Sequence, residues 1–146
     1  MQPVALNYWA GHHNFGDELS PYLVGKITRR AVVHAESKLS GKLVGIGSII
    51  NYHTAYSNSY IWGSGLLTRA SIRRRLISFK KIFCKSRVQA IRGPLTAEIL
   101  GQRGFEFSPV YGDPALLMPL FYTPRSDRGE GENRPCAASA AFGHDG

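Results

Sequence analysis

Five short apolar runs, each followed by glycine or small polar residues, constrain the fold of this 146-residue chain more than any other feature. They cover residues 4–9, 42–46, 60–62, 88–91 and 110–111. We interpret each run as a β-strand, because runs of this length bounded by turn-forming residues are typical of strands. Helical patterns lie between the runs, and no two-residue hairpin turns join them. The sequence therefore predicts an α/β fold with a Rossmann-like open parallel sheet.

Two stretches between the runs have the pattern of helices. In residues 17–30 apolar side chains recur at helical spacing, at Leu19, Leu23 and Ile27. Ser20 followed by Pro21 resembles an N-cap with proline at the first helical position, and the acidic Asp17 ahead of them suits the positive end of a helix. A second helix is expected over residues 95–100, ending near Gly101 or Gly104.

The residues that follow the runs are candidates for a ligand cleft. The carboxyl ends of parallel strands meet at one edge of a sheet, where helix N-termini also present backbone amides to anions. The alternative for each single loop is that its glycine only makes a tight turn. Five loops with the same placement favour a cleft. The candidate cleft residues are Asn14, Gly16, Asp17, Ser48, Ser64, Gly65 and Arg92.

Charge is unevenly distributed along the chain. No acidic residue occurs between Glu36 and Glu98, whereas nine basic residues lie between Arg69 and Arg92. Such a positive field suits an anionic partner, either a phosphorylated small molecule, an anionic membrane surface or a nucleic acid. The alternative is the solvated face of an amphipathic helix. Because zinc-finger spacing, RNA-recognition motifs and basic heptads are all missing from the sequence, we expect no nucleic-acid partner.

The cysteines and histidines indicate neither a metal site nor a disulfide framework. The two cysteines, Cys84 and Cys136, lie far apart, and the five histidines form no metal-binding pattern. We expect no protein-held metal and no cofactor. No apolar run reaches the length of a membrane helix, and residues 1–9 do not resemble a signal peptide. The expected location is the cytoplasm, either free or peripheral to the cytoplasmic membrane.

The composition changes near residue 124. From there on the chain is rich in Arg, Gly, Glu, Pro and Ala and almost lacks large apolar residues. We therefore expect two regions, a Rossmann-like domain over residues 1–120 and a disordered or aberrant tail over residues 121–146. A frameshift, a truncated gene and an artificial end are open explanations of the tail.

Five motifs in order along the chain carry a family resemblance. They are NFGDELSPYL at residues 14–23, GIGSI at 45–49, IWGSG at 61–65, AIRGPLT at 90–96 and YGDPALL at 111–117. Each motif is short, but together and at this spacing they resemble the polysaccharide pyruvyl transferase family, in particular the bacterial exopolysaccharide ketal-pyruvate transferases. The resemblance covers residues 5–119.

The resemblance implies a fold like one half of a two-domain GT-B-type transferase, with the active cleft between the halves. It also implies transfer of the pyruvyl unit of phosphoenolpyruvate to a saccharide, or to a lipid-linked oligosaccharide, as a cyclic ketal. Family members continue into a second domain that supplies further basic residues and a histidine. Since nothing after Pro119 resembles that domain, we expect no activity from this chain alone. The alternatives are a non-catalytic remnant or anion-binding module, and a glycosyltransferase half that uses a nucleotide sugar.

The chemistry of this reaction assigns roles to some candidate residues. Phosphoenolpyruvate carries a phosphate and a carboxylate, and an arginine binds either group in a bidentate way, so Arg92 is the first candidate for the donor. Ketal formation needs a general acid and a general base, and Asp17 serves as the base or holds the acceptor. Its alternative role is a helix-start carboxylate. Asn14 is a turn former or a sugar-binding amide, and Asp113 before Pro114 is expected to turn the chain.

Overall fold

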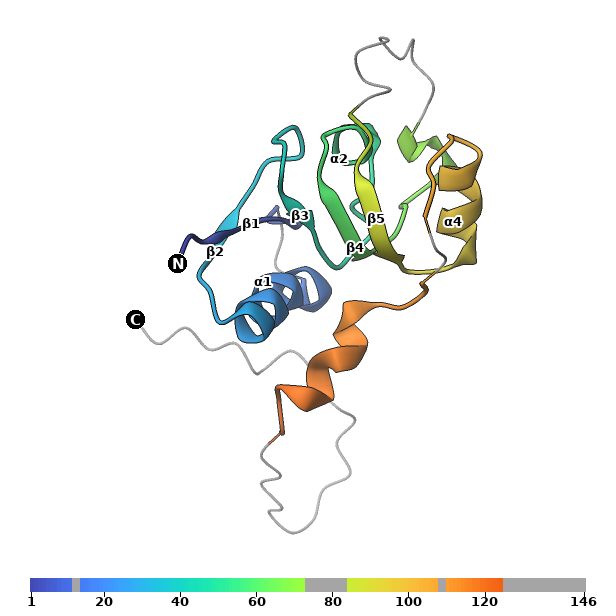
Figure 1. Ribbon diagram of the computed structural model, residues 1–146. Helices are drawn as coiled ribbons and strands as arrows, with labels where there is room; N and C mark the ends of the chain where they lie inside the picture. The colour runs from blue at the N-terminus through green and yellow to red at the C-terminus, as the bar shows by residue number, and fades with distance from the viewer. Residues whose placement is uncertain (12–13, 73–83, 108–109, 125–146) are drawn as a thin grey trace, which may run out of the picture.

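A five-stranded parallel sheet forms the centre of the molecule (Figure 1). The computed structural model describes residues 1–11, 14–72, 84–107 and 110–124. The strands are β1 (Val4–Asn7), β2 (Val32–His34), β3 (Leu43–Val44), β4 (Tyr60–Ser64) and β5 (Arg87–Ile91). They lie in the order β2-β1-β3-β4-β5, and every neighbouring pair is parallel. The predicted α/β class with a parallel sheet is thus confirmed.

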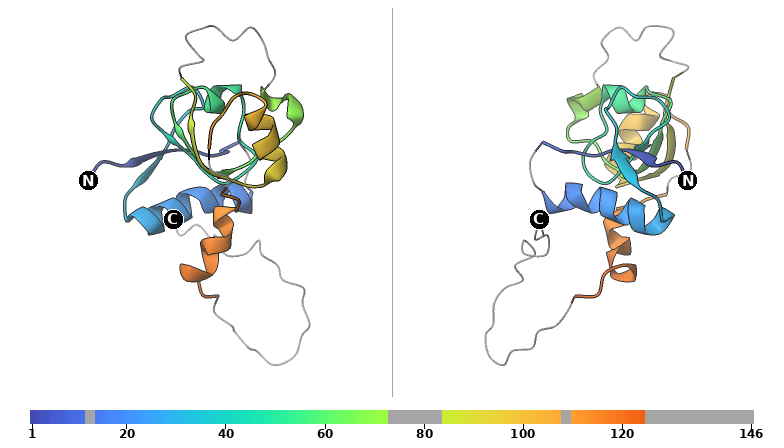
Figure 2. Two further views of the ribbon diagram at one scale, coloured as in Figure 1. Left: turned by 45° about the vertical axis from the view of Figure 1, so that its right-hand side comes forward. Right: turned by 90° about the vertical axis from the view of Figure 1, so that its left-hand side faces the viewer.

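The strand order reverses direction between β1 and β3. From β1 the chain crosses to β2 on one side, and from β3 it proceeds through β4 and β5 on the other. Right-handed crossovers in opposite directions place their helices on opposite faces of a sheet. Accordingly, α1 (Phe15–Thr28) lies on one side of the strands with the 3₁₀ helix η2 (Pro114–Leu120), and α2 (Tyr52–Ala55) and α4 (Pro94–Gly101) lie on the other (Figure 2). The 3₁₀ helix η1 (Arg69–Ile72) follows β4.

Two apolar clusters correspond to the two faces. The larger contains buried side chains of β3, β4 and β5 together with those of α2, α4 and the turn after α4, among them Val44, Ile61, Ile91 and Leu100. The smaller packs Leu19 and Leu23 of α1 against Ile46, with Met118 of η2 at its border. The helices thus bury apolar side chains against both faces of the sheet.

Helix α1 begins earlier than predicted. Asn14 is its N-cap, with an extended backbone (φ −138°, ψ 123°), and its Oδ1 accepts a hydrogen bond of 3.0 Å from the Gly16 amide. The expectation that Ser20 caps the helix and that Pro21 is its first residue is wrong, since Pro21 lies inside the helix. Ser20 is instead buried, and its Oγ accepts a 2.8 Å hydrogen bond from the Ile46 amide. Asp17 does lie in the first turn, where its charge complements the helix dipole.

The sheet differs from the prediction at its two edges. Strand β2 was not predicted, because its three residues form an edge strand with Val33 45% exposed and show no buried apolar run. The strand expected at residues 110–111 is reduced to a single parallel bridge between Ile91 and Tyr111. Helix α4 ends at Gly101, as expected. Residues 73–83 of the basic stretch lie outside the described residues, and so do residues 125–146 of the expected tail.

Lys42 is a buried cation just before β3. Its side chain is 0% exposed, and Nζ donates to Ser37 O at 2.9 Å, Leu39 O at 2.6 Å and Ser57 Oγ at 2.8 Å. Among the described residues, no carboxylate forms an ion pair with Lys42. Burial lowers the pKa of this ammonium group from 10.5 to about 8. Lys42 therefore ties the loop after β2, which carries Ser37, to the loop before β4.

Candidate functional site

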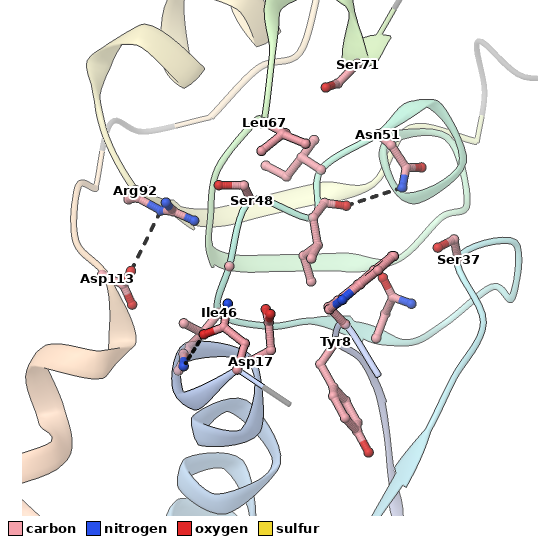
Figure 3. Close-up of a pocket in the computed structure, with 17 residues that line it drawn as sticks. Tyr8, Asp17, Ser37, Ile46, Ser48, Asn51, Leu67, Ser71, Arg92 and Asp113 are labelled. Atoms are coloured by element: carbon pink, nitrogen blue, oxygen red, sulfur yellow. Dashed lines mark hydrogen bonds and ion pairs between the residues drawn. The ribbon is translucent and has the colours of Figure 1, made fainter. Parts of the chain in front are cut away.

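A cavity of about 630 Å³ opens at the carboxyl edge of the sheet (Figure 3). It lies where the strand order reverses, which is the usual ligand position in open α/β sheets. Residues that follow all five strands contribute to its wall. Tyr8 and Trp9 come after β1, Ser37 after β2, Ser48 and Asn51 after β3, Leu67 and Ser71 after β4, and Arg92 after β5, while Asn14, Gly16 and Asp17 belong to the start of α1.

Asp17 presents its carboxylate to this cavity from the first turn of α1 (Figure 3). Gly47 lies directly against it, in the left-handed region at φ +115°, and a Cβ atom there would be only 2.9 Å from Asp17 Oδ1. Burial raises the pKa of the Asp17 carboxyl above its ordinary 3.8, and the positive charge of Arg92 offsets part of that rise. No described residue donates a hydrogen bond to this carboxylate. Asp17 is thus a partly buried carboxylate that borders the cavity and accepts no hydrogen bond from the described residues.

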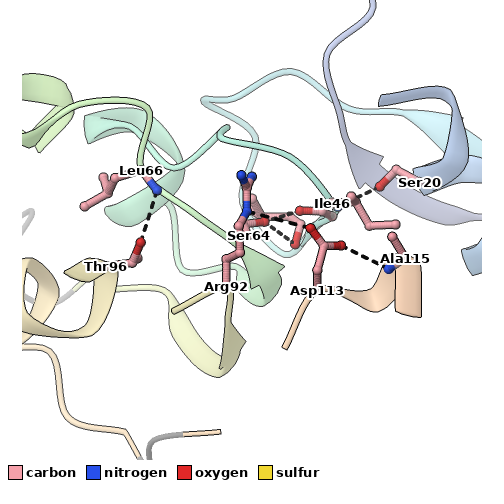
Figure 4. A network of polar contacts seen from close by, with 10 residues as sticks. Ser20, Ile46, Ser64, Leu66, Arg92, Thr96, Asp113 and Ala115 are labelled. Atoms are coloured by element: carbon pink, nitrogen blue, oxygen red, sulfur yellow. Dashed lines mark hydrogen bonds and ion pairs between the residues drawn. The ribbon is translucent and has the colours of Figure 1, made fainter. Parts of the chain in front are cut away.

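Arg92 follows β5 and belongs to the cavity wall. Its side chain is 41% exposed. Its Nε is 3.7 Å from Asp113 Oδ2 (Figure 4). Gly65 leaves room for this side chain, because a Cβ atom there would lie 3.2 Å from Arg92 Nε. The second oxygen of Asp113 accepts a 3.0 Å bond from the Ala115 amide, so Asp113 turns the chain into η2 as expected. Arg92 keeps terminal N–H donors for an anion.

Three further predicted residues lie in the cavity wall: Asn14, Gly16 and Ser48. Asn14 uses its side-chain oxygen to cap α1, which leaves its amide donors available. The Gly16 amide is the donor in that capping bond and is therefore not available to a ligand. The Ser48 hydroxyl makes no hydrogen bond within the described part of the chain, and Figure 3 shows it between Arg92 and Asn51.

The structure does not place Ser64 in the cavity wall. Ser64 is fully buried at the end of β4, and its Oγ donates to the backbone carbonyls of Val44 and Gly45 (Figure 4). Gly65 is also absent from the wall, and its amide donates to Gly47 O at 2.9 Å. Its effect on the site is indirect, through the space that it leaves for Arg92.

Several wall residues were not predicted from the sequence, namely Tyr8, Trp9, Ser37, Asn51, Leu67 and Ser71. Trp9 ends the first apolar run, so the sequence predicts it to be part of a strand. In the structure β1 ends at Asn7, and Trp9 is 53% exposed. Asn51 was detectable in principle, because it caps α2 in a capping box with Thr54. Ser37 had no sequence signal, since the strand ahead of it was missed.

The charges in the wall are one arginine and two carboxylates, Arg92, Asp17 and Asp113, among the described residues. No three His, Cys, Asp or Glu side chains in this part of the chain gather as a metal ion requires. None of the described helices combines the length and apolar character needed to cross a bilayer.

The fold and the cavity together define an α/β protein with a cavity at the carboxyl ends of its parallel strands, lined, among the described residues, by apolar side chains and three charged groups. No model of a known protein family matches the chain, and no curated protein or solved structure matches it either.

Proposed function

We propose that this chain is the N-terminal, GT-B-like half of a transferase that moves the pyruvyl unit of phosphoenolpyruvate onto a saccharide or lipid-linked oligosaccharide. The observation that carries the proposal is that one cavity contains both a partly buried carboxylate, Asp17, whose pKa is raised, and a strand-end arginine, Arg92. General acid-base chemistry needs the first, and an anionic donor needs the second. The strand order and the position of the cavity at its reversal are compatible with a Rossmann-like half.

In the proposed reaction two hydroxyl oxygens of the sugar each form a bond to C2 of the pyruvyl unit. The first adds to C2 while the enol methylene gains a proton and becomes a methyl group. The second displaces the phosphate, which leaves as inorganic phosphate with the remaining proton, so that no oxidant or reductant is needed. Asp17 accepts a hydroxyl proton, and the rise of its pKa above the ordinary value makes its carboxylate a stronger base. Arg92 holds the phosphate or the carboxylate of the donor.

The charge balance of the cavity limits what this half does alone. Phosphoenolpyruvate is a multiply charged anion, and Arg92 is the only cation in the wall among the described residues, with Asp113 3.7 Å from its Nε. We therefore expect this half to bind the donor, and to show a thermal shift, only at high concentrations of phosphoenolpyruvate, and turnover to need the cations that the family's second domain would supply.

A thermal-shift titration with phosphoenolpyruvate tests the proposal, because a ligand that binds the native state raises its melting temperature. Arg92→Ala should abolish the shift. Arg87→Ala is the matched control, since Arg87 stands at the opposite end of the same strand and its Nη1 donates to Tyr60 Oη. An equal shift in Arg92→Ala would contradict the proposed donor site, as would the absence of any shift in the wild type. A shift with a nucleotide sugar alone would favour the glycosyltransferase alternative.

A further inference from the structure

The cavity wall extends across the sheet, from the residue after β5 to the residues after β1 and β2. Arg92 and Asp113 lie at one end and Ser37 and Tyr8 at the other, with Asp17 between them (Figure 3). Strands β1 and β5 are three strand spacings apart, which is about 14 Å at the usual spacing of parallel strands. The end near β5 contains the only cation in the described wall. The end near β1 and β2 contains none, so it suits an uncharged ligand.

Trp9 lies in the wall at the uncharged end. It follows Tyr8, whose carbonyl oxygen is 3.2 Å from His34 Nε2 of β2, and this contact places it on the β1–β2 side of the cavity. The indole is 53% exposed although it is the largest apolar side chain in the wall. The backbone at Gly11 passes close to the ring, because a Cβ atom there would lie 2.8 Å from Trp9 Cζ2. The ring thus has a neighbour in the chain at Gly11 and keeps part of its surface open.

The cavity wall that contains Trp9 also contains hydrogen-bonding groups that the protein does not use. In the described part of the chain, the hydroxyls of Ser37 and Ser48 and the side-chain NH₂ of Asn14 make no hydrogen bond. An exposed aromatic ring in the same cavity as unused hydroxyl and amide groups can bind the apolar C–H face of a sugar ring, while those groups bind its hydroxyls. A phosphorylated ligand would instead require cations here.

We propose that Trp9 is the platform on which the pyranose ring of the acceptor saccharide stacks, with its hydroxyls directed to Ser37, Ser48 and Asp17. This inference rests on the proposed function for the role of the sugar as acceptor. It adds where the sugar binds, which residue recognises it and which face of the sugar meets the protein. In this arrangement Asp17 lies between the sugar and the donor at Arg92, where a base must stand to accept a hydroxyl proton.

Saturation-transfer NMR with three methyl pyranosides, of glucose, galactose and mannose, tests the platform on the full chain. At least one should receive saturation, strongest at the C–H protons of one ring face. Binding by the same sugar should fall about tenfold in Trp9→Ala and stay near the wild-type value in Trp9→Phe. Tyr122→Ala is the control, because Tyr122 is an exposed aromatic residue outside the cavity wall.

The outcomes separate this inference from the proposed function. Loss of sugar binding in Trp9→Ala with an unchanged phosphoenolpyruvate shift supports the platform. Sugar binding without any phosphoenolpyruvate shift would remove the proposed donor and leave the platform standing. If Trp9→Ala does not fold, the saturation pattern of the wild type and the sugar binding of Trp9→Phe still test whether Trp9 is the platform. Three results would overturn the inference: uniform saturation of all ring protons, unchanged binding in Trp9→Ala, or no binding of any of the pyranosides.

Discussion

Replacing Lys42 by methionine should change how the stability of the protein depends on pH. The ammonium group of Lys42 is 0% exposed, bonded only to carbonyl and hydroxyl oxygens, and its pKa is lowered from 10.5 to about 8. The unfolded chain therefore holds this proton up to about pH 10.5, whereas the folded protein releases it near pH 8. Between these values the unfolded state binds more protons, so the free energy of unfolding rises with pH.

The size of this rise follows from the two pKa values. At about 1.4 kcal/mol per pH unit, a lowering from 10.5 to about 8 corresponds to about 3 kcal/mol, gained progressively as the pH rises through that window. Lys42→Met cannot titrate and lacks this gain. At neutral pH the variant removes the cost of a buried charge but leaves the Leu39 carbonyl and the Ser57 hydroxyl without their donor, so the two effects oppose each other.

Urea unfolding followed by circular dichroism measures the difference between wild type and variant at each pH. That difference should shift by about 3 kcal/mol in favour of the wild type between neutral pH and pH 10.5. Lys38→Met is the matched control, because Lys38 belongs to the same loop and is exposed, and its difference from wild type should stay constant. A constant difference for Lys42→Met as well would refute the reasoning, since it would mean that the ammonium group is not desolvated.

Three other substitutions test the site and its frame. A raised carboxyl pKa makes the free energy of unfolding fall as the pH rises above 3.8, and Asp17→Asn should remove this fall. Urea unfolding between pH 4 and 7 measures it. An identical pH profile in wild type and variant would contradict the desolvation of Asp17. Gly65→Ala should weaken the phosphoenolpyruvate thermal shift, because the added Cβ displaces Arg92. The free energy of unfolding should change by less than about 1 kcal/mol. An undiminished thermal shift would contradict the role of Gly65 in making room for Arg92. Gly45→Ala should destabilise the fold by about 1–3 kcal/mol in urea because its Cβ overlaps Ser20 Oγ, and the double variant with Ser20→Ala should recover part of the loss; full additivity would argue against the overlap.

The central strands and α4 were predictable because local signals and tertiary structure agree there. The apolar runs before Gly63 and Arg92 end where β4 and β5 end, to within two residues, and Pro94 starts α4 at a position where proline is favoured. The edge strand β2 escaped prediction because a half-exposed strand of three residues needs no apolar run. Its stability comes from backbone pairing with β1, which no local pattern records.

The start of α1 shows how a correct rule gives a wrong boundary. Serine followed by proline is a frequent helix start, and Ser20-Pro21 fits that rule. Here the tertiary structure requires Ser20 inside the helix, where Gly45 approaches it closely and its hydroxyl bonds the Ile46 amide. The true cap is Asn14, for which the sequence predicts only a turn or sugar binding.

Position along the chain was enough to find Arg92 and Asp17, because side chains just after parallel strands converge at one edge. It was not enough for Ser64, because β4 continues to that residue and its hydroxyl turns toward β3. Trp9 and Ser37 enter the wall through the pairing of β1 with β2 and the loop that Lys42 holds, and these are relations between distant residues.

Amide chemical-shift mapping of phosphoenolpyruvate on the full chain tests the central claim most directly. If the cavity is the donor site, the perturbed amides should cluster at the carboxyl edge of the sheet, at Asp17, Ser48, Gly65 and Arg92, and Arg92→Ala should abolish the effect. Perturbations confined to the amino edge, around Lys85 and Arg87, or the lack of any perturbation, would contradict the account.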